Sequence, residues 1–148
     1  MRMIGLLNLT LCLLSVGQTA AQEPSFEPVA SISELMLDII YPKSDEIFYV
    51  MRAPPTNDYE WNLLRGSALI LAESGNLLMM GDRSIDQDGW VKNAKVLVDV
   101  GTAAFEAAEA HDLDAIIALN AALESSCRTC HEQYHPRYRR RGQDQPDQ

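Results

Sequence analysis

Apolar side chains recur every three or four residues along most of this chain, and that spacing restricts the chain to helices. Polar stretches divide the pattern into four segments, at residues 31–53, 57–80, 90–110 and 112–135. No stretch alternates as a half-buried strand does, and no segment repeats another. The sequence of 148 residues therefore predicts an all-α protein, an antiparallel up-down-up-down four-helix bundle that occupies residues 31–136 as one domain.

Two of the predicted helices begin at a polar residue that is followed three positions later by a glutamate. The pairs are Ser31 with Glu34 and Asn57 with Glu60. A side-chain oxygen at the first position of such a pair can accept a hydrogen bond from a backbone N–H that the helix leaves unpaired. We therefore expect helices to start at Ser31 and at Asn57.

The first and fourth segments each contain a residue that affects the continuity of the helix. Pro42 lacks a backbone N–H, so we expect the first helix to kink or break there and to restart at Ser44. Asp112 is placed to cap the fourth helix. That helix is expected to run unbroken into Cys127 and to stop at Pro136.

The N-terminal stretch has the composition of a secretory signal peptide. An almost uncharged apolar run, residues 3–16, follows Arg2, and small residues lead up to Ala21. A retained transmembrane helix would need roughly 20 apolar residues, more than this run holds. We therefore predict a signal peptide at residues 1–21, cleavage after Ala21 and export to the periplasm.

The segments that flank the predicted bundle are polar. Residues 22–30 hold two prolines and no apolar period, so we expect a flexible lead-in. Residues 137–148 form a polar, arginine-containing tail that we expect to be disordered. The net charge of −9 at pH 7 comes from acidic side chains on the body of the chain. Nucleic acid is therefore not an expected partner, and the acidic surface is expected to serve solubility.

The most specific motif in the sequence is C-x-x-C-H, formed by Cys127, Cys130 and His131. A random arrangement of the three cysteines and three histidines would produce it on the order of 10⁻³ times. Two thiols one helical turn apart can each add to a vinyl group of one haem, and the adjacent histidine then faces the iron. The motif predicts one covalently bound haem c, attached through both cysteines, with His131 as an axial ligand of the iron.

Three other interpretations explain the motif less well. A zinc site needs four ligands, and only His135 or His111 could supply the fourth. A thioredoxin-like pair opens a helix, whereas these cysteines are expected near a helix C-terminus. A structural disulfide would close almost no loop and would leave His131 without a role.

Together, the signal peptide, the four predicted helices and the single CxxCH motif near the C-terminus resemble the class II cytochromes c, the cytochrome c′ family. The motif reads Cys-Arg-Thr-Cys-His-Glu-Gln-Tyr at residues 127–134. The resemblance extends over residues 31–134 in architecture and is specific in residues only at the motif. The family commonly has Tyr followed by Arg after the motif, whereas here His135 follows Tyr134. That departure leaves open which side chain contacts the haem propionates or shields His131.

The resemblance also implies candidates for the other axial position of the iron. Some members of the family leave it open, and in others a methionine early in the first helix ligates the iron. Met36 is similar in placement to that methionine, so it is our preferred distal ligand, ahead of Met79 and Met80. Methionine on an apolar helix stripe is also a common core residue. Met51 lies 15 residues beyond Met36, roughly 22 Å along a helix, and is out of reach.

The resulting hypothesis is a periplasmic monohaem cytochrome that carries one electron at a time to or from a redox partner protein. The sequence offers no nucleophile with a paired base, so we do not expect an enzyme. A five-coordinate haem protein that binds NO or CO is the alternative, with a distal pocket lined by Leu35, Ile39 or Ile40. A third possibility is a haem-free interaction module with unmodified cysteines. The family resemblance further implies a possible homodimer through the first two helices.

Overall fold

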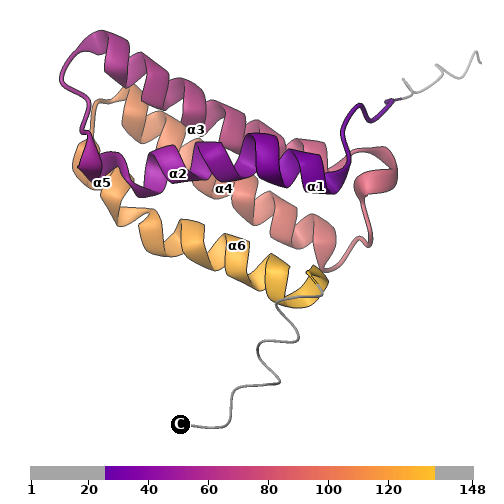
Figure 1. The fold of residues 1–148 in the computed structure, drawn as a ribbon. Coiled ribbons are helices and arrows are strands. Elements are labelled where there is room, and N and C mark those ends of the chain that lie inside the picture. Colours follow the sequence, from indigo (N-terminus) through magenta and orange to yellow (C-terminus); the bar gives the residue numbers. More distant parts are fainter. Residues whose placement is uncertain (1–25, 136–148) are drawn as a thin grey trace, which may run out of the picture.

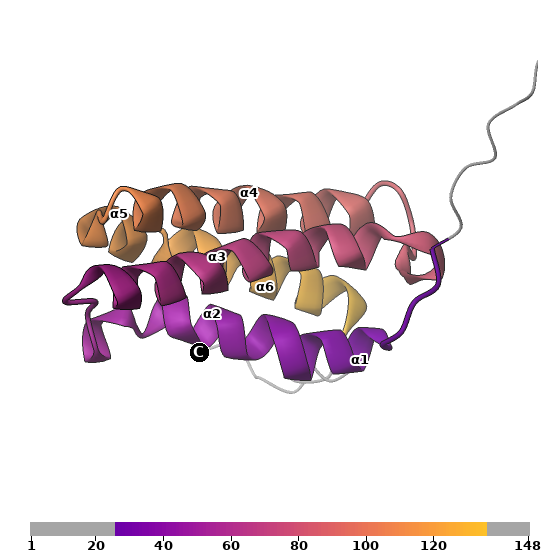
Figure 2. The same cartoon turned by 90° about the horizontal axis from the view of Figure 1, so that it is seen from above.

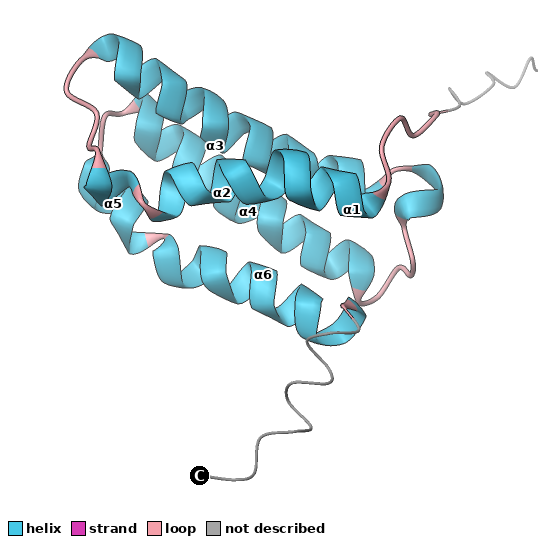
Figure 3. Cartoon of the chain, in the orientation of Figure 1, coloured by secondary structure: helices cyan, strands magenta, loops and turns pink. Residues whose placement is uncertain are grey.

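The structure, a computed structural model, describes residues 26–135, and these form helices and loops without any strand (Figures 1 and 3). The predicted all-α class is therefore confirmed for this part of the chain. The elements in chain order are α1 (Ile32–Glu34), η1 (Leu35–Ile40), α2 (Tyr41–Phe48), η2 (Val50–Arg52), α3 (Asp58–Met79), η3 (Gly81–Arg83), α4 (Trp90–Glu109), α5 (Leu113–Ala118) and α6 (Asn120–Tyr134). The predicted signal peptide and arginine-containing tail lie outside the described residues. Within residues 26–135, no helix is long and apolar enough to cross a membrane.

The first helix begins where the sequence predicts. The Ser31 hydroxyl accepts a hydrogen bond from the Glu34 N–H at 3.2 Å, and the Glu34 carboxylate accepts one from the Ser31 N–H at 2.7 Å. These two bonds form the predicted capping box. At α3, Asn57 accepts from the Glu60 N–H at 3.0 Å, so the second predicted cap is also confirmed.

Pro42 does not break the first helix, because α1, η1 and α2 follow one another without a gap. The turn before the proline is a π-helix, in which the Tyr41 N–H bonds to the Met36 carbonyl five residues back. Pro42 then lies in the first turn of α2. The π-helical turn shifts the hydrogen-bond partners by one residue just before the proline, at the point where its missing N–H interrupts the helical ladder.

The fourth predicted helix is also not continuous, because the chain turns at Leu119 between α5 and α6. The Leu119 N–H bonds to the Ile116 carbonyl three residues back, which tightens the last turn of α5. At the start of α6, the Asn120 side chain donates to the Phe48 carbonyl at 3.4 Å. The junction therefore lies beside the C-terminal end of α2. The predicted Asp112 cap is present, since its carboxylate accepts from the Ala115 N–H at 2.9 Å.

Helices α3 and α4 lie side by side along their lengths and approach closely at two glycines (Figure 2). A Cβ atom added to Gly101 would lie 2.6 Å from Ala72 Cα. One added to Gly75 would lie 2.8 Å from the Ala94 carbonyl oxygen. Since real Cβ atoms do not come this close to backbone, the contact between these two helices requires glycine at both positions.

The other helices pack on this pair from different sides. The first helix packs along α3, and α6 packs along α4, with only sparse contacts between α6 and the first helix. The largest fully buried apolar side chains are Ile47, Leu71, Ile116 and Leu123, from α2, α3, α5 and α6. All of them belong to one continuous hydrophobic core.

The close approach of α3 and α4 makes a testable prediction. Gly101→Ala should lower the free energy of unfolding by about 1–3 kcal/mol, because the added methyl group overlaps the Ala72 backbone. The matched control is Gly66→Ala within α3, where an added Cβ meets nothing within 4 Å. It should raise the free energy of unfolding by roughly 0.5–1 kcal/mol. Urea unfolding of both variants checks this, and equal effects would contradict the proposed close packing.

Candidate functional site

Cys127, Cys130 and His131 all lie in the C-terminal half of α6. Their spacing of three and four residues puts the three side chains on one face of the helix. Both cysteines are free thiols, so this structure does not contain the disulfide considered above. All three residues are partly buried, and Cys130 packs against the hydrophobic core. The structure therefore presents two thiols and one imidazole together, at the end of one helix.

The surroundings of these side chains favour their neutral forms. Burial, with a smaller contribution from Glu124, raises the pKa of the Cys127 thiol. Burial and the neighbouring Cys127 raise the pKa of Cys130. Burial and then His135 lower the pKa of His131, whose imidazole is accordingly neutral at pH 7. Redox-active cysteine pairs depend on a lowered thiol pKa, so a thioredoxin-like role does not fit this environment.

Four chain segments meet at the end of the molecule that holds this group. The Arg83 guanidinium, in the loop after α3, donates to the Ala30 carbonyl at 2.7 Å just before α1 begins. The Trp90 indole N–H, at the start of α4, donates to the Leu78 carbonyl at 2.7 Å. Its ring also meets the Tyr134 ring edge-on, with centroids 5.1 Å apart. The start of the first helix, the end of α3, the start of α4 and the end of α6 are therefore tied together.

Met36 lies in η1, about one helical turn after the start of the first helix. Its side chain is partly buried and packs against the hydrophobic core, as the side chain of Met79 does at the end of α3. Leu35 and Ile40 are buried, at 2% and 5% exposure. The π-helical geometry around Met36 was not predicted from the sequence. Single π-helical turns are frequent at functional sites.

The interactions of Asp86 at this end were not predicted either. The Asp86 carboxylate accepts hydrogen bonds from the Gly89 N–H at 2.6 Å, the Trp90 N–H at 3.0 Å and the Tyr134 hydroxyl. Sequence analysis could have found the first two, because they are local bonds from N–H groups three and four residues after Asp86, just where a helix is expected to begin. The bond to Tyr134 joins residues 48 positions apart and has no local sequence pattern.

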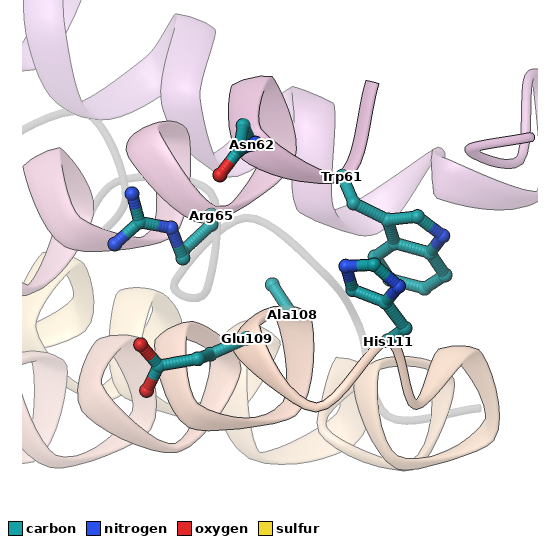
Figure 4. A pocket seen from close by; sticks show the side chains of 6 residues that line it. All are labelled: Trp61, Asn62, Arg65, Ala108, Glu109 and His111. Atoms are coloured by element: carbon teal, nitrogen blue, oxygen red, sulfur yellow. The ribbon is translucent and has the colours of Figure 1, made fainter. Parts of the chain in front are cut away.

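A separate pocket of about 290 Å³ lies at the opposite end of α4 (Figure 4). It is lined by Trp61, Asn62, Arg65, Ala108, Glu109 and His111. The rings of Trp61 and His111 stack with centroids 4.8 Å apart. Ala108 is 18 residues beyond Trp90, roughly 27 Å along α4, so this pocket is distant from the cysteines.

His111 terminates α4 in an uncommon way. Its φ is 55°, a left-handed conformation that glycine usually occupies at this position. The His111 N–H bonds to the Ala108 carbonyl and the Asp112 N–H to the Ala107 carbonyl, which together form a Schellman motif. The stack of the His111 ring on Trp61 stabilises this left-handed conformation of a non-glycine residue. The arrangement of His111 in the pocket therefore follows from how α4 ends.

No protein-family model matches the chain, and no curated protein and no solved structure matches it. Within residues 26–135, no three His, Cys, Asp or Glu side chains gather as a site for a metal ion. The function must therefore be argued from the residues at the end of α6.

The hydrogen bonds to the Asp86 carboxylate predict that the free energy of unfolding depends on pH in the acidic range. Hydrogen bonds from Tyr134, Trp90 and Gly89 hold the pKa of Asp86 below its ordinary value of 3.8. The ionised carboxylate therefore stabilises the fold fully above about pH 4, and this contribution is lost as the pH falls through the lowered pKa. In urea unfolding, the stability difference between wild type and Asp86→Asn should be constant from pH 7 to about pH 4 and shrink below.

The matched control for this experiment is Asp88→Asn, which removes the same charge from the same exposed loop and leaves the Asp86 carboxylate in place. A difference between wild type and Asp86→Asn that stays constant down to about pH 2 would show that the Asp86 carboxylate is not preferentially stabilised in the folded state.

Proposed function

We propose that this protein is an exported monohaem c-type cytochrome that transfers one electron at a time in the periplasm. In this proposal it is a four-helix bundle of the class II cytochrome c type, and not an enzyme. The observation that carries the proposal is the group formed by Cys127, Cys130 and His131 on one face of α6.

The chemistry of these side chains fits covalent attachment of haem. Each thiol can add its S–H across one vinyl C=C bond, so that one C–S bond and one C–H bond form and nothing leaves. The reaction needs reduced cysteines, and both are free thiols in the structure. Their separation by one helical turn matches two attachment points on one planar group. His131, the next residue after Cys130, would then ligate the iron.

The packing around α6 also suits a large planar group. Helix α6 is packed along α4, while its contacts with the first helix are sparse (Figure 1). The side chains of Cys127, Cys130 and His131 are only partly buried by the protein. A bound group beside this face would cover them without displacing the contact between α6 and α4. When bound, the haem iron supplies reversible one-electron chemistry, and the chain supplies attachment, burial and axial ligands.

Met36 is the proposed sixth ligand, and the start of its helix is tied to the same end of the molecule through the bond from Arg83 to Ala30. A thioether ligand favours ferrous iron and raises the reduction potential, which suits an electron carrier. A redox partner protein and a possible homodimer belong to the same proposal.

One observation favours the alternative function, a five-coordinate haem protein that binds NO or CO. The Met36 side chain packs against the hydrophobic core, and a methionine that stays there leaves the sixth position open. Ile39 is partly buried beside the core and could face a small gas ligand, whereas Leu35 and Ile40 are already buried within the core. The coordination state of the iron separates the two functions.

The first prediction from this proposal concerns the mass of the purified protein. Expressed with periplasmic export and haem-attachment machinery, the mature chain should carry one haem that remains bound after denaturation, because thioether bonds survive unfolding. Mass spectrometry measures this directly. Cys127→Ala with Cys130→Ala should abolish the attachment, and a wild-type chain of unmodified mass would leave only the haem-free interaction module.

The second prediction concerns the sixth ligand. The reduced wild-type protein should have a low-spin absorption spectrum that CO barely changes, because Met36 occupies the sixth position. Met36→Ala should convert it to a form whose spectrum shifts at once with CO. Met79→Ala tests the runner-up ligand, another partly buried methionine packed on the same core, and should keep the low-spin spectrum. A wild-type spectrum that is high-spin and shifts with CO would contradict the role of Met36 and support the gas-binding function.

A further inference from the structure

One polar and aromatic cluster joins the end of α6 to the start of α4. Asp86 accepts from the Tyr134 hydroxyl while the same carboxylate caps the start of α4 at Gly89 and Trp90. The Tyr134 ring lies edge-on to Trp90, at an interplanar angle of 84°. One turn away, the Asn93 side chain donates to the Gln133 side chain at 3.2 Å. We call this cluster the α6 clamp.

The backbone of α4 is fitted to this cluster. A Cβ atom on Gly89 would overlap the Tyr134 hydroxyl and the Gln133 amide, so a larger residue there would require the ends of these two side chains to move. Trp90 is buried, at 3% exposure, and is fixed by its bond to the Leu78 carbonyl. The clamp therefore attaches α6 to the start of α4, which is itself bonded to the end of α3.

Tyr134 is three residues beyond His131, which places the two side chains on neighbouring positions of one helix face. Few contacts join α6 to the first helix, so the contact with α4, which includes the clamp, holds this part of α6 in place together with the packing of Cys130 on the core. The position of the His131 imidazole consequently depends on where Tyr134 is held.

We infer that Asp86 and Tyr134 are positioning residues, which hold the end of α6 on α4 so that His131 presents its imidazole to the haem iron in one orientation. This inference rests on the proposed function. If two thioether bonds fix the haem, a small displacement of the end of α6 changes the orientation of the His131 imidazole. The covalent attachment of the haem stays intact. Loss of the clamp should therefore weaken the bond between iron and His131 without releasing the haem.

The test uses two variants of the purified full mature protein. Tyr134→Phe removes the hydroxyl and keeps the ring on Trp90, and Asp86→Asn keeps an oxygen that can accept from the α4 amides while removing the charge. Matched controls are Tyr59→Phe, since that tyrosine is 71% exposed, and Asp88→Asn on the same loop as Asp86.

Two readouts are measured on each variant. The first is backbone hydrogen exchange by mass spectrometry. Loss of a hydrogen bond to a charged group should raise the exchange rates of residues 127–134 about tenfold or more. Exchange in α3 should stay as in the wild type. The second readout is the iron–histidine vibration of the reduced protein, measured with every variant placed in a Met36→Ala background so that the sixth position of the iron is open. The band should broaden and shift to lower frequency in both clamp variants and stay unchanged in both controls.

The outcomes separate the inference from the proposed function. A wild-type chain without haem would overturn the proposed function. A chain with haem, whose exchange and iron–histidine band are the same in Tyr134→Phe as in the wild type, would overturn the positioning role alone. Faster exchange spread equally over the whole chain would also overturn it, since the residues would then support the fold in general.

Discussion

The close approach of α3 to α4 determines how the rest of this structure is arranged. Gly101 lies on the backbone of Ala72 and Gly75 on that of Ala94, so the two longest helices form a narrow pair. The remaining helices cover the two long sides of this pair, one side each. The first helix packs on α3, and α6 packs on α4. Both outer helices contribute to one core while making few contacts with each other.

Sequence reasoning predicted the features of this fold that depend on neighbours along the chain. The caps at Ser31, Asn57 and Asp112 are formed by residues three positions apart, and all are present. Pro42 shows where such reasoning stops. The cost of a proline inside an α-helix is well defined, but the chain avoids it with a π-helical turn whose acceptor, the Met36 carbonyl, is displaced by one residue. The choice between a break and a widened turn depends on core packing by Leu35 and Ile40, which no local pattern describes.

The candidate site also has one part that local sequence spacing predicts and one part that it does not. The spacing of Cys127, Cys130 and His131 defines their shared helix face, and α6 carries them near its C-terminal end as expected. The clamp on the same helix depends on residues that lie far apart in the sequence. Asp86 and Tyr134 became recognisable as partners only when the loop before α4 and the end of α6 were brought together. The Asp86 carboxylate accepts hydrogen bonds from two backbone N–H groups at the start of α4 and from the Tyr134 phenol.

The two residues proposed as axial ligands, His131 and Met36, lie in surroundings that are held by different kinds of interaction. Around His131, directed hydrogen bonds from Tyr134 and the α4 amides converge on a single carboxylate, and partial burial together with Asp86 raises the pKa of Tyr134 to about 12. The phenol therefore remains a donor at every pH at which the protein would function. Met36, by contrast, is held by apolar contacts, which have no direction and allow a flexible thioether to take more than one position. A chain built this way fixes its histidine firmly and its methionine weakly. Between the two functions proposed above, an electron carrier and a gas-binding protein, the distinction thus depends on whether a bound haem iron would hold the Met36 sulfur more strongly than the core does.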